Sequence, residues 1–143
     1  MIGKLFIISN LFILITFAVV AQEKKSELLD EGFGVSSKPL NCESSLLRLE
    51  KIRSLIQTGT SEKSILILIA RLGNKERNRK INRLRLENVR RGLTNTLGIV
   101  KPIVIAEGER VNGFGRVEVY LDGKFIGALL AQKNKIVIKC DIG

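Results

Sequence analysis

Two short apolar runs, separated by a long amphipathic segment, constrain the fold of this chain most. The runs are Ser64–Ala70 and Pro102–Ala106, and their length and β-branched residues favour strands buried on both faces. The segment Arg77–Leu97 between them predicts a helix, because its apolar residues recur at helical spacing. The residues expected on its core side are Ile81, Leu84, Val89, Leu93 and Leu97, with Gly98 as the C-terminal stop. Two strands joined by one helix predict a right-handed βαβ unit with parallel strands.

A first helix is expected before this unit. Asn41 is a helix-capping residue, and it precedes an apolar repeat of three or four residues that reaches Ile56. The apolar residues of this repeat are Leu46, Leu49, Ile52, Leu55 and Ile56. Gly59 is expected to end the helix.

The C-terminal third predicts antiparallel strands. Residues 116–121 alternate apolar and polar side chains, and Asp122-Gly123 separates them from the apolar run 124–131, which is typical of a tight hairpin. Residues 135–140 predict one further strand. The expected fold is therefore α+β: a two-layer sandwich, a mixed β-sheet with two helices on one face, containing the βαβ unit and C-terminal antiparallel hairpins.

The N-terminal segment has the pattern of a secretory signal peptide. Lys4 precedes the apolar run Leu5–Ala21, which ends in small residues suited to signal-peptidase cleavage. The expected organisation is a signal peptide at 1–21, a linker at 22–40 and an α+β domain at 41–143. An uncleaved membrane anchor is the alternative, since the run is near the lower limit for a span, and it is the one membrane contact expected. Either way, we expect a periplasmic or extracellular protein.

Export changes the interpretation of the two cysteines. An even pair in an oxidising compartment predicts a disulfide between Cys42 and Cys140. Two buried free thiols are the alternative.

Composition excludes several classes of site. The 143 residues include no histidine and only two cysteines, which excludes histidine-dependent triads and four-cysteine zinc sites. Glu107 and Glu109 resemble a carboxylate pair for acid–base chemistry, but pairing with a basic helix is the favoured interpretation. We expect no enzyme activity, no metal and no cofactor.

Positive charge is concentrated in one segment. The chain has 24 Lys and Arg against 14 Asp and Glu, and nine basic and two acidic residues fall between Arg71 and Arg91. Cations near a helix N-terminus oppose the helix dipole. The segment is therefore either a solvated polar face or an anion site at the C-terminal end of the first strand, where ligands of open α/β sheets often bind.

The same segment resembles a known family. Residues 78–89 read NRKINRLRLENV, which is similar to the motif N-x-x-L-S-x-x-R-A-x-x-V of OmpA C-terminal-like peptidoglycan-binding domains. Asn78, Arg85 and Val89 match the motif outright. Glu107-Gly108-Glu109 looks like the G-x-G-E turn of that family, and residues 115–118 (GRVE) are similar to its R-R-V-E strand. The resemblance covers about residues 43–121.

The resemblance implies a ligand site. The family clamps the diaminopimelate of peptide stems, with a loop Asp on the ammonium and a helix Arg on the carboxylate. Arg85 matches that Arg, whereas residues 71–74 (RLGN) stand where the Asp would be and leave a purely cationic site. The expected ligand-binding residues are Arg71, Asn78 and Arg85, converging on one patch at the C-terminal edge of the first strand.

These observations lead to two expectations of function. The first is an exported, non-catalytic binding domain of the bacterial cell envelope that associates with peptidoglycan peptide stems through the basic helix. The alternative is a protein-interaction module on the same fold that binds an envelope protein and no glycan. Nucleic-acid binding is not expected, because the protein is exported and its basic helix lacks aromatic residues.

Overall fold

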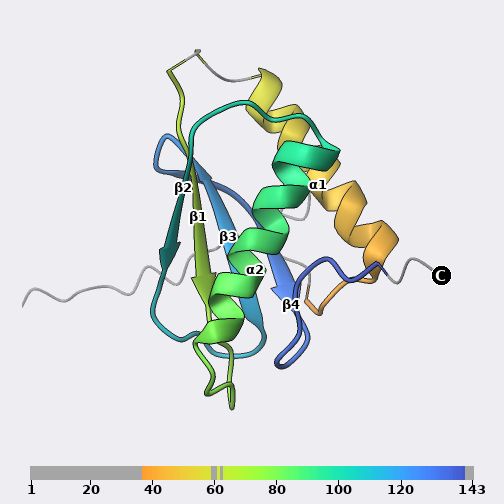
Figure 1. Ribbon diagram of the computed structural model, residues 1–143, viewed down its shortest axis with the longest axis vertical. Helices are drawn as coiled ribbons and strands as arrows, with labels where there is room; N and C mark the ends of the chain where they lie inside the picture. Colours follow the sequence, from red (N-terminus) through yellow and green to blue (C-terminus); the bar gives the residue numbers. More distant parts are fainter. Residues whose placement is uncertain (1–36, 59–60, 62, 141–143) are drawn as a thin grey trace, which may run out of the picture.

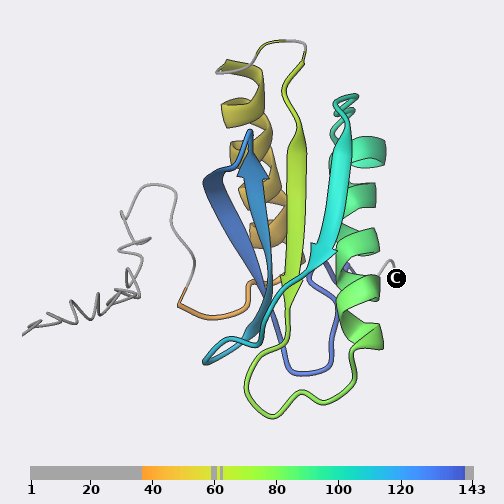
Figure 2. The same cartoon turned by 90° about the vertical axis from the view of Figure 1, so that its left-hand side faces the viewer.

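Four strands form one mixed sheet, and two helices pack against one face of it (Figures 1 and 2). The computed structural model describes residues 37–58, 61 and 63–140, so the predicted signal peptide and most of the predicted linker lie outside the described residues. The elements are α1 (Cys42–Thr58), β1 (Leu66–Arg71), α2 (Lys80–Arg91), the π-helical turn η1 (Gly92–Thr96), β2 (Ile103–Glu107), β3 (Gly115–Leu121) and β4 (Lys124–Ala131). The sheet order is β2-β1-β3-β4, which confirms the predicted α+β fold. Neither helix of the described residues has the length and apolar character needed to cross a membrane.

The predicted βαβ unit is present at the centre of the fold. Strands β1 and β2 pair in parallel and are connected by α2. On its other side β1 pairs antiparallel with β3. Along β1, Leu66, Leu68 and Ala70 are fully buried under the helices, whereas the alternate residues face the open side and are half-buried. The prediction that this strand is buried on both faces is therefore wrong for its open side, which neither α1 nor α2 covers.

The local signals for a cap and a turn are confirmed. The side-chain oxygen of Asn41 accepts a hydrogen bond from the Ser44 N–H at 2.9 Å, which caps α1. Asp122 and Gly123 adopt positive φ angles of 50° and 79°, the conformation that a tight hairpin requires. Gly98, also at positive φ, ends the helical segment that follows α2.

Four of the five residues predicted on the core side of this helical segment are buried, and the exception is Leu84. Leu84 is 56% exposed, while Asn82, Arg85 and Leu86 are buried. The helix also begins at Lys80 rather than Arg77 and passes into the π-helical turn after Arg91. The prediction placed apolar residues inward by spacing alone, and it was wrong at Leu84 because two polar side chains take inward positions.

Strand β2 is an exposed edge strand rather than a buried one. Val104 and Ile105 are 51% and 47% exposed, and β2 lies at the end of the sheet order. The length and apolar content of the run predicted a strand correctly, but these features do not reveal whether a further strand lies beside it.

The C-terminal segment (Gln132–Cys140) lies along α2 and forms no strand, so the strand predicted at 135–140 is wrong (Figure 1). Side chains of α2 bind its backbone instead. The Asn88 amide donates to the Ile138 carbonyl at 3.1 Å and accepts from the Ile138 N–H at 2.7 Å, as a neighbouring strand would. Val137 is buried in the core beneath this contact.

A disulfide between Cys42 and Cys140 links the two ends of the folded domain. The two Cα atoms are 4.9 Å apart and 98 positions apart in the sequence. The bond joins the start of α1 to the end of the C-terminal segment, which confirms the predicted pairing.

We expect that the double variant Cys42→Ser/Cys140→Ser loses about 2–4 kcal/mol of free energy of unfolding, because the bond closes a long loop in the unfolded chain. Urea unfolding of the oxidised protein and of the variant measures this difference. Thiol labelling of the folded, non-reduced protein should give no reaction, and two reactive thiols would contradict the bridge.

Candidate functional site

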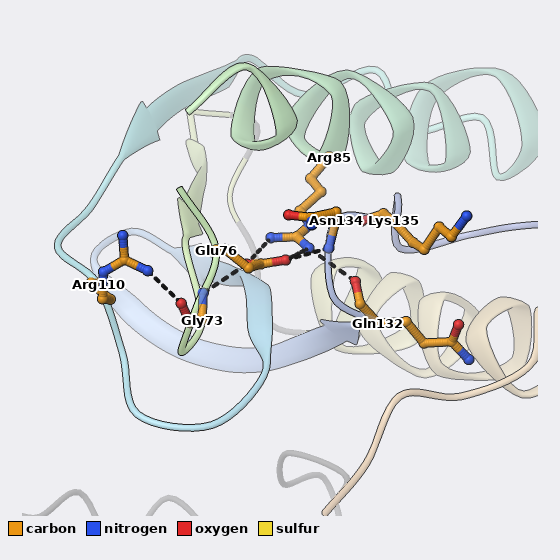
Figure 3. A network of polar contacts seen from close by, with 7 residues as sticks. All are labelled: Gly73, Glu76, Arg85, Arg110, Gln132, Asn134 and Lys135. Atoms are coloured by element: carbon orange, nitrogen blue, oxygen red, sulfur yellow. Dashed lines mark hydrogen bonds and ion pairs between the residues drawn. The ribbon is translucent and has the colours of Figure 1, made fainter. Parts of the chain in front are cut away.

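Arg85, the residue that matches the family's ligand-binding Arg, is fully buried and bonded within the protein (Figure 3). Its guanidinium donates to both carboxylate oxygens of Glu76, at 2.8 and 2.6 Å. It also donates to the carbonyl oxygens of Lys135 at 2.9 Å and Gln132 at 3.2 Å. The guanidinium therefore binds an internal carboxylate and the C-terminal segment, and it presents no free face to a ligand in this structure.

Glu76 is the partner that sequence reasoning missed. Besides the two bonds from Arg85, its carboxylate accepts the backbone N–H of Gly73 at 2.8 Å and of Asn134 at 2.7 Å. Burial alone would raise the pKa of Glu76, but the hydrogen bonds from Arg85, Gly73 and Asn134 outweigh it and lower the pKa to about 2. Glu76 is therefore ionised at neutral pH, although only 1% of it is exposed.

Gly115 leaves room for this ion pair at the start of β3. A Cβ atom on Gly115 would collide with the Arg85 guanidinium and with the Glu76 carboxylate. The ion pair thus lies between α2, the loop after β1, the start of β3 and the C-terminal segment. The Glu76 carboxylate binds three of these parts, which are α2, the loop after β1 and the C-terminal segment.

Arg71 lies on the opposite face of the sheet from Arg85. It follows Ala70, which faces the helices, so strand alternation directs Arg71 to the open face. There it donates to Glu118 at 2.8 Å, and Arg116 and Tyr120 bind the same carboxylate at 2.7 and 3.0 Å. The prediction that Arg71, Asn78 and Arg85 converge on one patch is therefore wrong.

Asn78 lines an open groove beside the start of α2. The groove has a volume of about 960 Å³ and runs between the loop before α2, the first turns of α2 and the turn at residues 133–134. Its lining residues are Lys75, Arg77, Asn78, Lys80, Ile81, Leu84, Lys133 and Asn134. Four of the eight carry a positive charge and none carries a negative charge, so the groove is a candidate site for an anionic group.

The buried ion pair supports both walls of this groove. Glu76 lies between Lys75 and Arg77 in the sequence, and its carboxylate holds the N–H of Asn134 in the opposite wall. The Asn78 side chain accepts the Lys80 N–H at 3.0 Å, which fixes the turn that enters α2. Of the predicted site residues, Asn78 lines the groove, Arg85 supports it from beneath, and Arg71 lies elsewhere.

Glu107 and Glu109 line a smaller crevice on the β2 side of α2. Its volume is about 320 Å³, and Arg79 and Arg110 also line it. Glu107 accepts a long hydrogen bond from the Asn82 side chain, at 3.4 Å. Among the described residues, Glu107 therefore contacts the basic helix through the amide of Asn82, and not through an Arg or Lys.

We expect that Arg85→Ala or Glu76→Ala alone lowers the free energy of unfolding by about 3–5 kcal/mol, because each variant leaves a buried charge without its partner. Arg85→Lys should remain destabilised, since one ammonium cannot reproduce two parallel bonds to a carboxylate. Urea unfolding at pH 7 measures these differences. Losses below about 1 kcal/mol would mean that the pair is dispensable.

Glu76 should also make stability depend on acid. Its pKa falls from 4.5 to about 2 on folding, so the folded protein binds fewer protons than the unfolded chain. Its contribution, roughly 3 kcal/mol, is complete above pH 4.5 and is lost as the pH falls towards 2.

Unfolding measured from pH 6 to pH 2 should show this loss in the native protein. Glu76→Gln should be less stable at pH 6 and should have a flatter profile across the same range. Parallel profiles for the two proteins would contradict the assignment.

Comparisons with protein-family models, with curated proteins and with solved structures give no match to this chain. The structure shows an α+β fold with a mixed four-stranded sheet and two helices. The assignment of a function therefore rests on the groove and on the ion pair beneath it.

Proposed function

We propose that this protein is an exported, non-catalytic binding domain of the bacterial cell envelope, which associates with the carboxylates of peptidoglycan peptide stems. The binding site is the basic groove beside α2 rather than Arg85 itself. The observation that carries the proposal is the composition of the groove, in which four cations and two side-chain amides surround an open hollow without a carboxylate.

The groove suits a ligand with several carboxylates along a flexible chain. Lys75, Arg77, Lys80 and Lys133 supply positive charge from both walls. Lysine ammonium groups act as point charges with rotating donors, so they accommodate carboxylates at varied positions. The exposed side chain of Leu84 adds an apolar surface within the same hollow.

The disulfide and the sequence motif support the cellular setting. A disulfide of this kind persists in oxidising compartments, which fits a periplasmic or extracellular protein. The resemblance of residues 78–89 to the helix motif of OmpA C-terminal-like domains supports peptidoglycan as the source of the carboxylates. Because Arg85 holds Glu76, we assign Arg85 the role of a positioning residue for the groove.

A protein-interaction module on the same fold is the second candidate. It is favoured by the exposed apolar residues of strand β2 at the edge of the sheet. In this case the protein would bind an envelope protein and show no affinity for glycan.

Sedimentation with purified, insoluble peptidoglycan tests the first proposal, using the protein purified after export. We expect Lys80→Ala/Lys133→Ala to weaken binding roughly tenfold, because two charges of the groove are removed. Binding should also weaken as salt rises, since exposed charges are screened.

The matched control is Lys63→Ala/Lys124→Ala, which removes two exposed lysines outside the groove. This control should bind nearly as well as the native protein. Equal losses for the two double variants would mean a non-specific basic surface, and no binding by the native protein would favour the interaction module.

A further inference from the structure

The outer edge of β2 carries backbone groups that no described residue binds. Two bonds fix the alternation of the β1–β2 ladder: the Leu66 N–H donates to the Pro102 carbonyl at 3.0 Å, and the Gly108 N–H donates to the Ala70 carbonyl at 2.9 Å. The even-numbered residues of β2 therefore point their backbone groups at β1, and the odd-numbered residues point theirs away from the sheet. The outward-pointing residues are Ile103, Ile105 and Glu107.

Apolar side chains gather around this edge. Four of the large apolar residues that are exposed in the described part of the chain lie on β2 or directly beside its start. They are Ile65 (43% exposed), Val100 (98%), Val104 (51%) and Ile105 (47%). Edge strands are commonly protected by Lys or Pro, yet Ile103–Glu107 contains neither. An apolar, unprotected edge is typical of a surface that pairs with another strand.

We propose that this edge pairs with β2 of a second copy of the chain, in an antiparallel arrangement centred on Ile105. In this register Ile105 lies opposite Ile105 of the second copy, and Ile103 lies opposite Glu107. Each of these pairs exchanges two hydrogen bonds, so all outward-pointing groups of both strands are used. On the open face, Val104 packs beside Ala106 of the second copy.

Charge complementarity identifies a second copy as the partner. The same register places Lys101 opposite Glu109 of the second copy, and the two-fold symmetry repeats this contact. The Lys101 ammonium donates to the Ser61 carbonyl at 2.9 Å, and two of its N–H donors remain for a further carboxylate. The hydrogen bond from the Ile65 N–H and, less strongly, the Lys101 charge lower the pKa of Asp122 in the same copy. Among the described residues, the Glu109 carboxylate forms no ion pair. A basic residue before the strand and an acidic one after it suit antiparallel pairing with an identical strand.

The positive charge of α2 makes this pairing depend on salt, because the two basic helices of the dimer repel each other. Helix α2 packs mainly on β1, so the two α2 helices of the dimer lie about three strand spacings, or roughly 14 Å, apart on one face. This separation exceeds the Debye length of about 8 Å at physiological ionic strength. Their repulsion is therefore screened in 150 mM salt, and the dimer should weaken at low salt.

Sedimentation equilibrium of the protein purified after export, at up to about 1 mM in 150 mM salt, tests the proposal. The concentration is high because an interface made mainly by one five-residue strand from each copy is expected to be weak. We expect a monomer–dimer equilibrium. Ile105→Pro should give a monomer, since it removes an outward N–H that β1 does not use and leaves the fold intact. Hydrogen exchange at the amides of Ile103, Ile105 and Glu107 should slow as the concentration of native protein rises.

The charge reversals distinguish a second copy from a foreign strand. Lys101→Glu or Glu109→Lys alone should weaken the dimer roughly tenfold, because each reversal replaces two attractive contacts with two repulsive ones. The double reversal Lys101→Glu/Glu109→Lys should restore it. A protein that stays monomeric at 1 mM, a dimer that Ile105→Pro leaves unchanged, or a double reversal that fails to restore pairing would each overturn the proposal.

Discussion

The ion pair between Glu76 and Arg85 is the interaction on which the rest of the structure depends. Its carboxylate receives four N–H groups from three different segments, and its guanidinium reaches two carbonyl oxygens of the C-terminal segment. A buried ion pair adds little net stability compared with apolar residues of the same shape, because both charges are desolvated. Its value here is positional, because the loop before α2 and the turn at residues 133–134 form the two walls of the basic groove.

Helix α2 acts on the C-terminal segment as a strand edge would. Asn88 exchanges two hydrogen bonds with the backbone of Ile138, and Arg85 binds two carbonyl groups nearer the start of the segment. The segment is thus held without joining the sheet, and side chains bind several of its backbone groups. This arrangement leaves β4 at one end of the sheet and covers Arg85.

Residue types and their spacing predicted a helix cap, a hairpin turn and the βαβ unit correctly. The cap at Asn41, the turn at Asp122-Gly123 and the βαβ unit follow from residue types and spacing, and the structure has all three. The buried polar residues of α2 did not follow, since spacing rules place only apolar residues inward and give no sign that Arg85 and Asn82 lie there too. Glu76 lies nine positions before Arg85, outside the helix, so no helical periodicity connects the two residues. Arg71 lies on the open face because side chains alternate along β1, and the charged run in which it occurs gave no sign of this alternation.

The covalent ring closed by Cys42 and Cys140 has a consequence for resistance to proteolysis. A protease that cuts one peptide bond anywhere between these two residues produces two fragments that remain attached to each other. Their reassociation is then intramolecular, so the effective concentration of one fragment around the other stays high. A nicked molecule can therefore keep the paired strands and the groove together, and it takes a second cut, or a reductant, to release a piece.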